Sequence, residues 1–310
     1  MNLRAAGLIG VAVTAAAVLT ACGSGDGPGG DGRPVLVASF YPLQFVTQRI
    51  AGDRAEVTGL TPPGAEPHDL ELEPKDVAAV SEADLVVYLK GFQPSVDEAV
   101  SGEAADAGVD VTPAARLDLA AAPEEGDGGH DGEAGAAGRD PHFWLDPTRL
   151  SAVAGVVAER LAAADGGGAA TYRANAEKLQ ADLATLDGEF RAGLASCTSR
   201  DLVTSHQAFG YLAQQYGLTQ VGITGVSPDA EPQPADLARV TDFVRQHQVR
   251  TIYHETLASP AIARTVAGET GAGTAVLDPL EGLTEDSDGG DYLAVMRSNL
   301  AHLREGQPCP

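Results

Sequence analysis

Basic side chains are scarce in this sequence of 310 residues, because 20 Lys and Arg stand against 44 Asp and Glu and leave a formal net charge of −24. A surface this acidic repels phosphate groups, which argues against nucleic acid or anionic lipid as a partner of the folded body. The same excess of carboxylates is compatible with a cationic ligand. With 44% apolar residues the chain is nevertheless globular, and its length predicts about two domains.

Complete catalytic motifs are also lacking. His254 and Glu255 begin an H-E-x-x-H pattern, but residue 258 is Ala. The segment 225–229 departs from the G-x-S-x-G nucleophile elbow at its last residue, and no phosphate-binding loop occurs. The stretch 25–30 matches G-x-G-x-x-G in letters only, since no strand precedes it, and we interpret it as a tether. Because these motifs are incomplete, we expect a protein that is not an enzyme. An extracytoplasmic zinc metalloenzyme is kept as a less favoured alternative.

Cysteine occurs only three times, and the first, Cys22, closes the N-terminal apolar segment. Arg4 followed by the apolar run 5–21 is typical of a secretory signal, and that run is short for a bilayer that needs about 20 apolar residues. Small residues precede Cys22 and a polar Gly-rich tract follows it, an arrangement that resembles a bacterial lipoprotein signal. We expect residues 1–22 to be the signal, 23–33 a flexible tether, and a lipidated Cys22 to anchor the chain to the outer face of the membrane.

The remaining cysteines, Cys197 and Cys309, form a lone pair. Export places them in an oxidising compartment, where such a pair usually forms a disulfide. The sequence therefore predicts that the C-terminus is bonded to the base of the second half.

Short β-prone runs alternate with helical patterns on both sides of the chain's middle. This alternation predicts an α/β fold with mainly parallel sheets covered by helices. The expected strands are 34–40, 55–60, 84–89, 109–112, 201–204, 219–223, 250–253 and 274–277, and the expected helices are 42–51, 75–81, 148–165, 169–194, 208–216, 234–247, 260–270 and 292–304.

The longest expected helix, 169–194, carries apolar residues at steps of three and four and would be about 39 Å long at 1.5 Å per residue. Its place in mid-chain suggests a rigid helix joining two β/α lobes. We expect an N-terminal lobe at 34–168, with a low-complexity acidic loop at 120–140, and a C-terminal lobe at 195–310.

Metal-competent side chains follow several of the expected strands. In α/β sheets, ligands bind beyond the carboxyl ends of the strands. His68, His206, Glu255 and Asp278 each lie in such a loop. Each alone is equally compatible with a turn or cap residue, and Glu255 could instead orient an imidazole from behind or replace Asp278 as a ligand. Their joint placement favours a metal site where the lobes meet.

His142 lies in the segment 140–147 (DPHFWLDP), which also contains the only Trp of the sequence. Pro141 and Pro147 restrict the backbone around His142, as a preorganised ligand requires, although a structural turn would look similar. Zinc prefers four N and O ligands at about 2.0 to 2.2 Å, and three His with Asp278 would complete a tetrahedron without an open position for water.

Four stretches carry a family resemblance that extends from about residue 35 to the C-terminus. They are 62–68 (PPGAEPH), 140–147 (DPHFWLDP), 204–212 (TSHQAFGYL) and 277–280 (LDPL). The chain resembles the metal-binding lipoproteins of ABC importers for zinc and manganese, the zinc-type (ZnuA-like) branch in particular. The resemblance implies two lobes joined by a long helix, the ligands His68, His142, His206 and Asp278, and a monomer that delivers Zn²⁺ to an importer permease.

The third ligand decides the expected metal within this family. The manganese-type branch tends to carry a carboxylate where this sequence has His206, and three nitrogens with one oxygen suit zinc better. A manganese-type receptor or an adhesin of the same family remains the alternative. The sequence departs from the zinc-type pattern in its acidic loop, which offers only His130 where many members have a His-rich segment.

Overall fold

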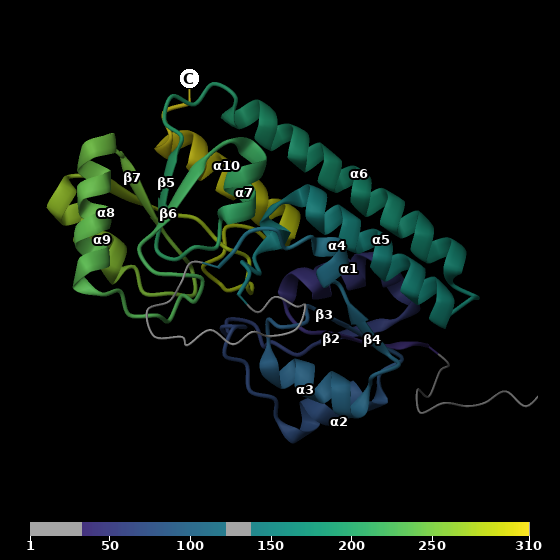
Figure 1. Ribbon diagram of the computed structural model, residues 1–310. Coiled ribbons are helices and arrows are strands. Elements are labelled where there is room, and N and C mark those ends of the chain that lie inside the picture. Colours follow the sequence, from purple (N-terminus) through teal and green to yellow (C-terminus); the bar gives the residue numbers. More distant parts are fainter. Residues whose placement is uncertain (1–32, 122–137, 310) are drawn as a thin grey trace, which may run out of the picture. The chain divides into compact units, whose positions relative to one another are not determined.

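Two parallel β-sheets organise the chain in the computed structural model, which describes residues 33–121 and 138–309. The first sheet has the order β2-β1-β3-β4, with β1 (Val35–Ala38), β2 (Glu56–Gly59), β3 (Leu85–Tyr88) and β4 (Gly108–Asp110). The second repeats this topology as β6-β5-β7-β8, with β5 (Asp201–Thr204), β6 (Thr219–Gly222), β7 (Thr251–His254) and β8 (Gly273–Val276). Every strand pair is parallel, so the expected α/β fold with two parallel-sheet lobes is confirmed (Figure 1).

Helices connect successive strands and cover both faces of each sheet (Figure 1). Their bounds are α1 (Tyr41–Ala51), α2 (Pro74–Glu82), α3 (Pro94–Glu103), α4 (Thr112–Ala115), α5 (Pro147–Ala164), α6 (Ala169–Leu194), α7 (Gly210–Tyr216), α8 (Pro234–His247), α9 (Ala261–Thr270) and α10 (Tyr292–Gly306), with 3₁₀ turns η1 (Gly52–Arg54) and η2 (Phe143–Leu145). None of the helices in the described part of the chain is long and apolar enough to cross a bilayer.

Alternation along the strands divides the buried side chains among three cores. In β1, Leu36 and Ala38 face the largest core, whereas Val37 faces a smaller one under α2 and α3. In β5, Leu202 joins the largest core and Val203 joins a separate one under α8 and α9. The largest core thus contains side chains from both sheets, and the described residues belong to one compact unit.

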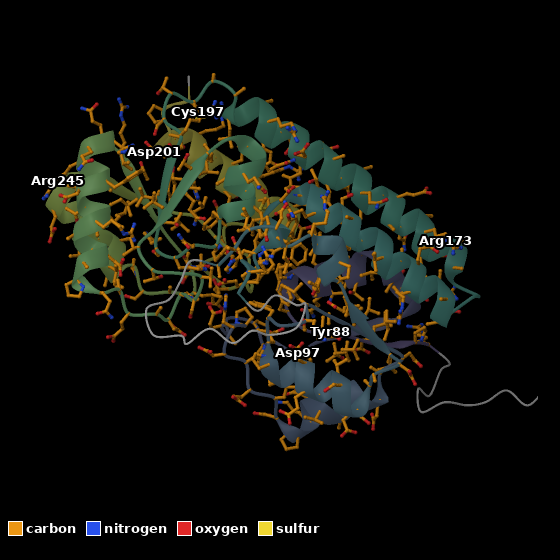
Figure 2. All side chains as sticks on the ribbon, in the orientation of Figure 1. Tyr88, Asp97, Arg173, Cys197, Asp201 and Arg245 are labelled. Carbon is orange, nitrogen blue, oxygen red and sulfur yellow. A yellow bond between two sulfur atoms is a disulfide. The ribbon has the colours of Figure 1, made fainter. Side chains whose placement is uncertain are left out.

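Helix α6 has the predicted bounds, Ala169–Leu194, and it packs against helices of both halves. It contacts α1 and α5 from the first half and α7 and α10 from the second. Its buried residues recur at helical spacing, from Tyr172 through Leu183 to Leu194. The predicted disulfide is also confirmed, because Cys197, labelled in Figure 2, is bonded to Cys309.

Two helices, α3 and α4, were not expected. Both begin with Pro at the first or second position, and α3 buries only Val96, Ala99 and Val100, so its apolar pattern is weak. Cys22, the signal at 1–22, nearly all of the tether at 23–33, His130 and most of the acidic loop lie outside the described residues.

Candidate metal centre

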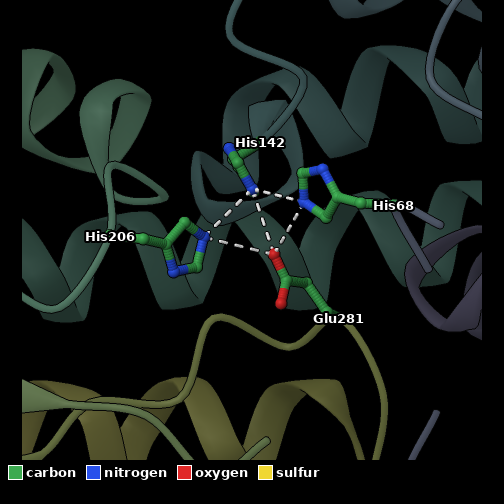
Figure 3. A group of neighbouring side chains, drawn as sticks. All are labelled: His68, His142, His206 and Glu281. Carbon is green, nitrogen blue, oxygen red and sulfur yellow. Dashed lines mark hydrogen bonds and ion pairs between the residues drawn. The ribbon is translucent and has the colours of Figure 1, made fainter. Parts of the chain in front are cut away.

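Three imidazoles and one carboxylate meet between the carboxyl ends of the two sheets. His68 comes from the loop after β2, His142 immediately precedes η2, His206 follows β5, and Glu281 lies in the loop after β8. One ligand atom from each lies within 4.8 Å of every other (Figure 3). The three histidines are the ones that the sequence predicted to converge.

The spacing of these atoms can be compared with a metal-centred tetrahedron. Nε2 of His142 lies 3.3 Å from Nε2 of His68 and 3.4 Å from Nε2 of His206. Oε1 of Glu281 lies 3.2, 3.0 and 3.4 Å from Nε2 of His68, His142 and His206, respectively. A tetrahedron with metal–ligand bonds of about 2.0 to 2.1 Å has edges of about 3.3 to 3.4 Å. The donor set therefore has the chemistry of a zinc site, and five of its six edges are close to that size, while the sixth, between His68 and His206, is at most 4.8 Å.

His142 and His206 are held from behind in the same way. Oδ1 of Asp140 accepts from the backbone N–H of His142 at 2.9 Å and lies 2.8 Å from its Nδ1. Glu255 contacts the backbone N of His206 at 3.2 Å and its Nδ1 at 2.6 Å. A carboxylate at Nδ1 favours the tautomer whose Nε2 lone pair points into the site. This contact is one of the two roles expected for Glu255.

The same carboxylates govern the protonation of these two imidazoles. Burial alone lowers the pKa of His142, but Asp140 and Glu281 outweigh it and raise that pKa above its usual value. Burial also opposes protonation of His206, yet Glu255 and Glu281 raise its pKa well above the usual value. Burial would raise the pKa of Glu281, but the three imidazoles, His206 foremost, hold it well below its usual range. Glu281 is therefore a carboxylate, a competent metal ligand.

His68 has a different environment. Its side chain is 12% exposed, against 0% for His142 and 1% for His206. Its Nδ1 has no carboxylate partner in the described ranges, and burial, together with the neighbouring His142 and His206, lowers its pKa although Glu281 opposes this. Glu66 accepts from its backbone N–H at 3.1 Å, and burial together with Glu281 raises the pKa of Glu66 to about 8.

Asp278 is not part of the cluster, contrary to the expectation from the sequence. Its Oδ1 accepts from the backbone N–H of Leu280 at 2.8 Å and its Oδ2 accepts from Ser287 Oγ at 2.8 Å. The short side chain is thus turned back onto its own loop, and the longer side chain of Glu281 reaches the imidazoles instead. Glu281 and Asp140 were missed, although Glu281 lies only three residues beyond Asp278 in the same strand-end loop.

Trp144 connects the His142 segment with the Glu281 loop. Its Nε1 donates to the carbonyl of Pro279 at 2.7 Å, and its own carbonyl accepts from Tyr292 OH at 2.6 Å. Its ring centroid lies 5.1 Å from that of His142. Trp144 therefore packs beside His142 and bonds its segment to the loop of Glu281 in the other half of the molecule.

Comparison with known proteins agrees with this geometry. Residues 36–306 match the family model described as zinc-uptake complex component A periplasmic, ZnuA. The high-affinity zinc uptake system protein ZnuA of Bacillus subtilis is 37% identical over 304 residues, which cover 93% of each chain. The zinc-binding lipoprotein AdcA of Streptococcus pneumoniae is 37% identical over 285 residues, but these cover 89% of this chain and only 56% of AdcA. The chain thus spans little more than half of that longer relative.

Solved structures show the same fold. The Zn(II)-bound ZnuA-like domain of S. pneumoniae AdcA superposes with a TM-score of 0.72 at 34% identity, covering 89% of this chain and 99% of that domain. A mutant structure of the laminin-binding adhesin Lmb from Streptococcus agalactiae gives a TM-score of 0.77 at 30% identity, covering 88% and 99%.

Proposed function

Since the chain belongs to the ZnuA family of zinc-uptake components, we propose that it is an extracytoplasmic receptor that binds Zn²⁺ through His68, His142, His206 and Glu281 and delivers it to an ABC-type importer. The observation that carries this proposal is the cluster of three Nε2 atoms and one carboxylate oxygen, in which five of the six separations are 3.0 to 3.4 Å. In this proposal Zn²⁺ is the cargo of the protein.

The donor set favours zinc over manganese, and a receptor over a metalloenzyme. Three borderline nitrogens with one oxygen suit zinc better than manganese, which prefers oxygen ligands. Four protein ligands complete a tetrahedron, whereas catalytic zinc sites keep a position for water. The set therefore favours a receptor over a metalloenzyme.

The N-terminal leader sequence supports a location of the receptor at the outer face of the membrane. We propose that Cys22 is lipidated, that residues 23–33 tether the body to the outer face of the membrane, and that the chain works as a monomer beside a permease. The name of a relative, zinc-binding lipoprotein, supports the anchor. Under this proposal the two lobes shift little on binding, because α6 packs against helices of both halves and the largest core joins both sheets.

Metal titration tests the function. The metal-free protein is titrated with Zn²⁺ and Mn²⁺ in competition with a chelator, beside His142→Ala, His206→Ala and His247→Ala. His247 is a matched control, because it pairs at the surface with Asp201 at the start of β5, whereas His206 follows the end of that strand. We expect zinc to bind more tightly than manganese and only the first two substitutions to weaken it.

Two results would contradict the proposal. One is zinc affinity no better than about micromolar that neither substitution at the cluster weakens. The other is zinc-dependent hydrolysis that Glu255→Gln abolishes, which would favour the metalloenzyme. Tighter binding of Mn²⁺ would instead support a manganese-type receptor.

A further inference from the structure

The loop that carries Glu281 contains a backbone conformation that its sequence does not favour. Leu280 has φ of 59°, in the left-handed region, and its side chain is fully buried. A bulky non-glycine residue in this region is uncommon and persists only where its surroundings determine it. Leu280 directly precedes Glu281, so its conformation sets the direction in which the Glu281 side chain leaves the backbone.

Outside the cluster, the carboxylate of Glu281 has no hydrogen-bond partner among the described residues. Its Oε1 faces the three imidazoles, but its Oε2 is buried and has no hydrogen-bond partner among the described residues. His142 and His206, by contrast, are each held by a carboxylate behind the ring. The position of Glu281 therefore depends on the backbone of its loop.

Asp278 is the residue that fixes this backbone. Its Oδ1 accepts from the N–H of Leu280 at 2.8 Å, which closes a side-chain turn across Pro279. Its own backbone is paired twice with Asn299 of α10, since its N–H donates to Asn299 Oδ1 at 2.9 Å and its carbonyl accepts from Asn299 Nδ2 at 2.7 Å. Asp278 is thus anchored to a helix on one side and bonded to Leu280 on the other.

From this arrangement we infer that Asp278 is a positioning residue: it holds Leu280 in the left-handed conformation and so presets the carboxylate of Glu281 as the fourth ligand before the metal arrives. The inference rests on the proposed zinc function. Without the bond from Leu280 to Asp278, the loop relaxes, Glu281 turns away from the imidazoles, and water takes its place on the metal. Preorganisation of this kind slows release of the ion.

A double-mutant cycle tests the inference in the mature protein. We measure zinc dissociation rates by chelator competition, and the visible absorption of bound Co²⁺, for the wild type, Asp278→Ala, Glu281→Ala and the double variant. We expect Asp278→Ala to release zinc about tenfold faster, as is typical when a partner behind a ligand is lost. In the Glu281→Ala background the second change should have no further effect, because Asp278 acts through Glu281.

Two matched variants separate positioning from general damage to the fold. Asp278→Asn keeps an oxygen that accepts from the Leu280 N–H, so we expect it to retain the dissociation rate and the Co²⁺ spectrum of the wild type. Ser287→Ala removes the partner of the other oxygen, at 2.8 Å, and leaves the Leu280 bond in place. We expect it to behave like the wild type as well.

A wild-type dissociation rate and spectrum in Asp278→Ala would overturn the inference. An effect of Asp278→Ala that is equally large in the Glu281→Ala background would overturn it too, because the damage would then not pass through Glu281. Either result leaves the zinc function intact if the wild type binds zinc tightly. Failure of the wild type to bind zinc would instead overturn the proposed function.

Discussion

His142 and His206 are the fully buried histidines of the cluster, whereas His68 is partly exposed. The first two are at most 1% exposed and each has a carboxylate at Nδ1, at 2.8 and 2.6 Å. The side chain of His68 is 12% exposed and is packed edge-on against Phe92, with ring centroids 4.8 Å apart. Two ligands are therefore built into hydrogen-bonded pairs that belong to the fold, and the third is held mainly by packing. The difference predicts that substitutions at the two kinds of ligand have unequal effects.

The largest expected effect is a difference in the free energy of unfolding between variants at these two kinds of ligand. His206→Ala leaves the carboxylate of Glu255 buried without its partner, and breaking a buried pair of this kind costs about 3 to 5 kcal/mol. His68→Ala leaves Glu281 paired with His142 and His206 and should cost about 1 kcal/mol. Urea unfolding of the metal-free variants measures both values. Equal losses would mean that the two regions are not held differently.

The second prediction tests the carboxylates behind the rings. Asp140→Asn and Glu255→Gln keep the shape of each side chain but remove its charge, and we expect zinc affinity to fall about 10- to 100-fold in each. Glu66→Gln is the matched control beside His68, because Glu66 Oε1 lies 3.9 Å from His68 Nε2. Its effect should be smaller than either of the others. Chelator competition provides the measurement, and an effect of Glu66→Gln as large as that of Glu255→Gln would remove the distinction.

The sequence was sufficient to predict His68 and His206 because strand ends are visible in it, whereas His142 was predicted from the two prolines that frame its segment. Parallel strands bring their carboxyl ends together, so residues that follow different strands converge even when they lie far apart in the chain. Helix α6 was predicted to the residue, since its apolar spacing is regular from Tyr172 to Leu194. Regular periodicity and the strand-end rule together account for the architecture.

The fourth member of the cluster could not be predicted in the same way. Asp278 and Glu281 follow the same strand, and only the conformation between them decides which one faces the imidazoles. That conformation depends on Leu280 at φ of 59°, a region that Leu rarely adopts, and on Asn299, which lies 21 residues further along the chain. Neither feature has a local signal in the sequence.

The smallest expected effect concerns the hydrogen bond that connects the His142 segment with the Glu281 loop. Trp144→Phe removes the N–H that donates to Pro279 and leaves that buried carbonyl unpaired, at a cost of about 1 to 3 kcal/mol. Because this bond joins the His142 segment to the Glu281 loop, we expect zinc to dissociate faster, by less than in Glu255→Gln. Phe143→Leu is the control, since Phe143 is equally buried in the same segment but makes no side-chain hydrogen bond to the loop. If Trp144→Phe and Phe143→Leu change the dissociation rate equally, packing around His142 matters and the bond to Pro279 does not.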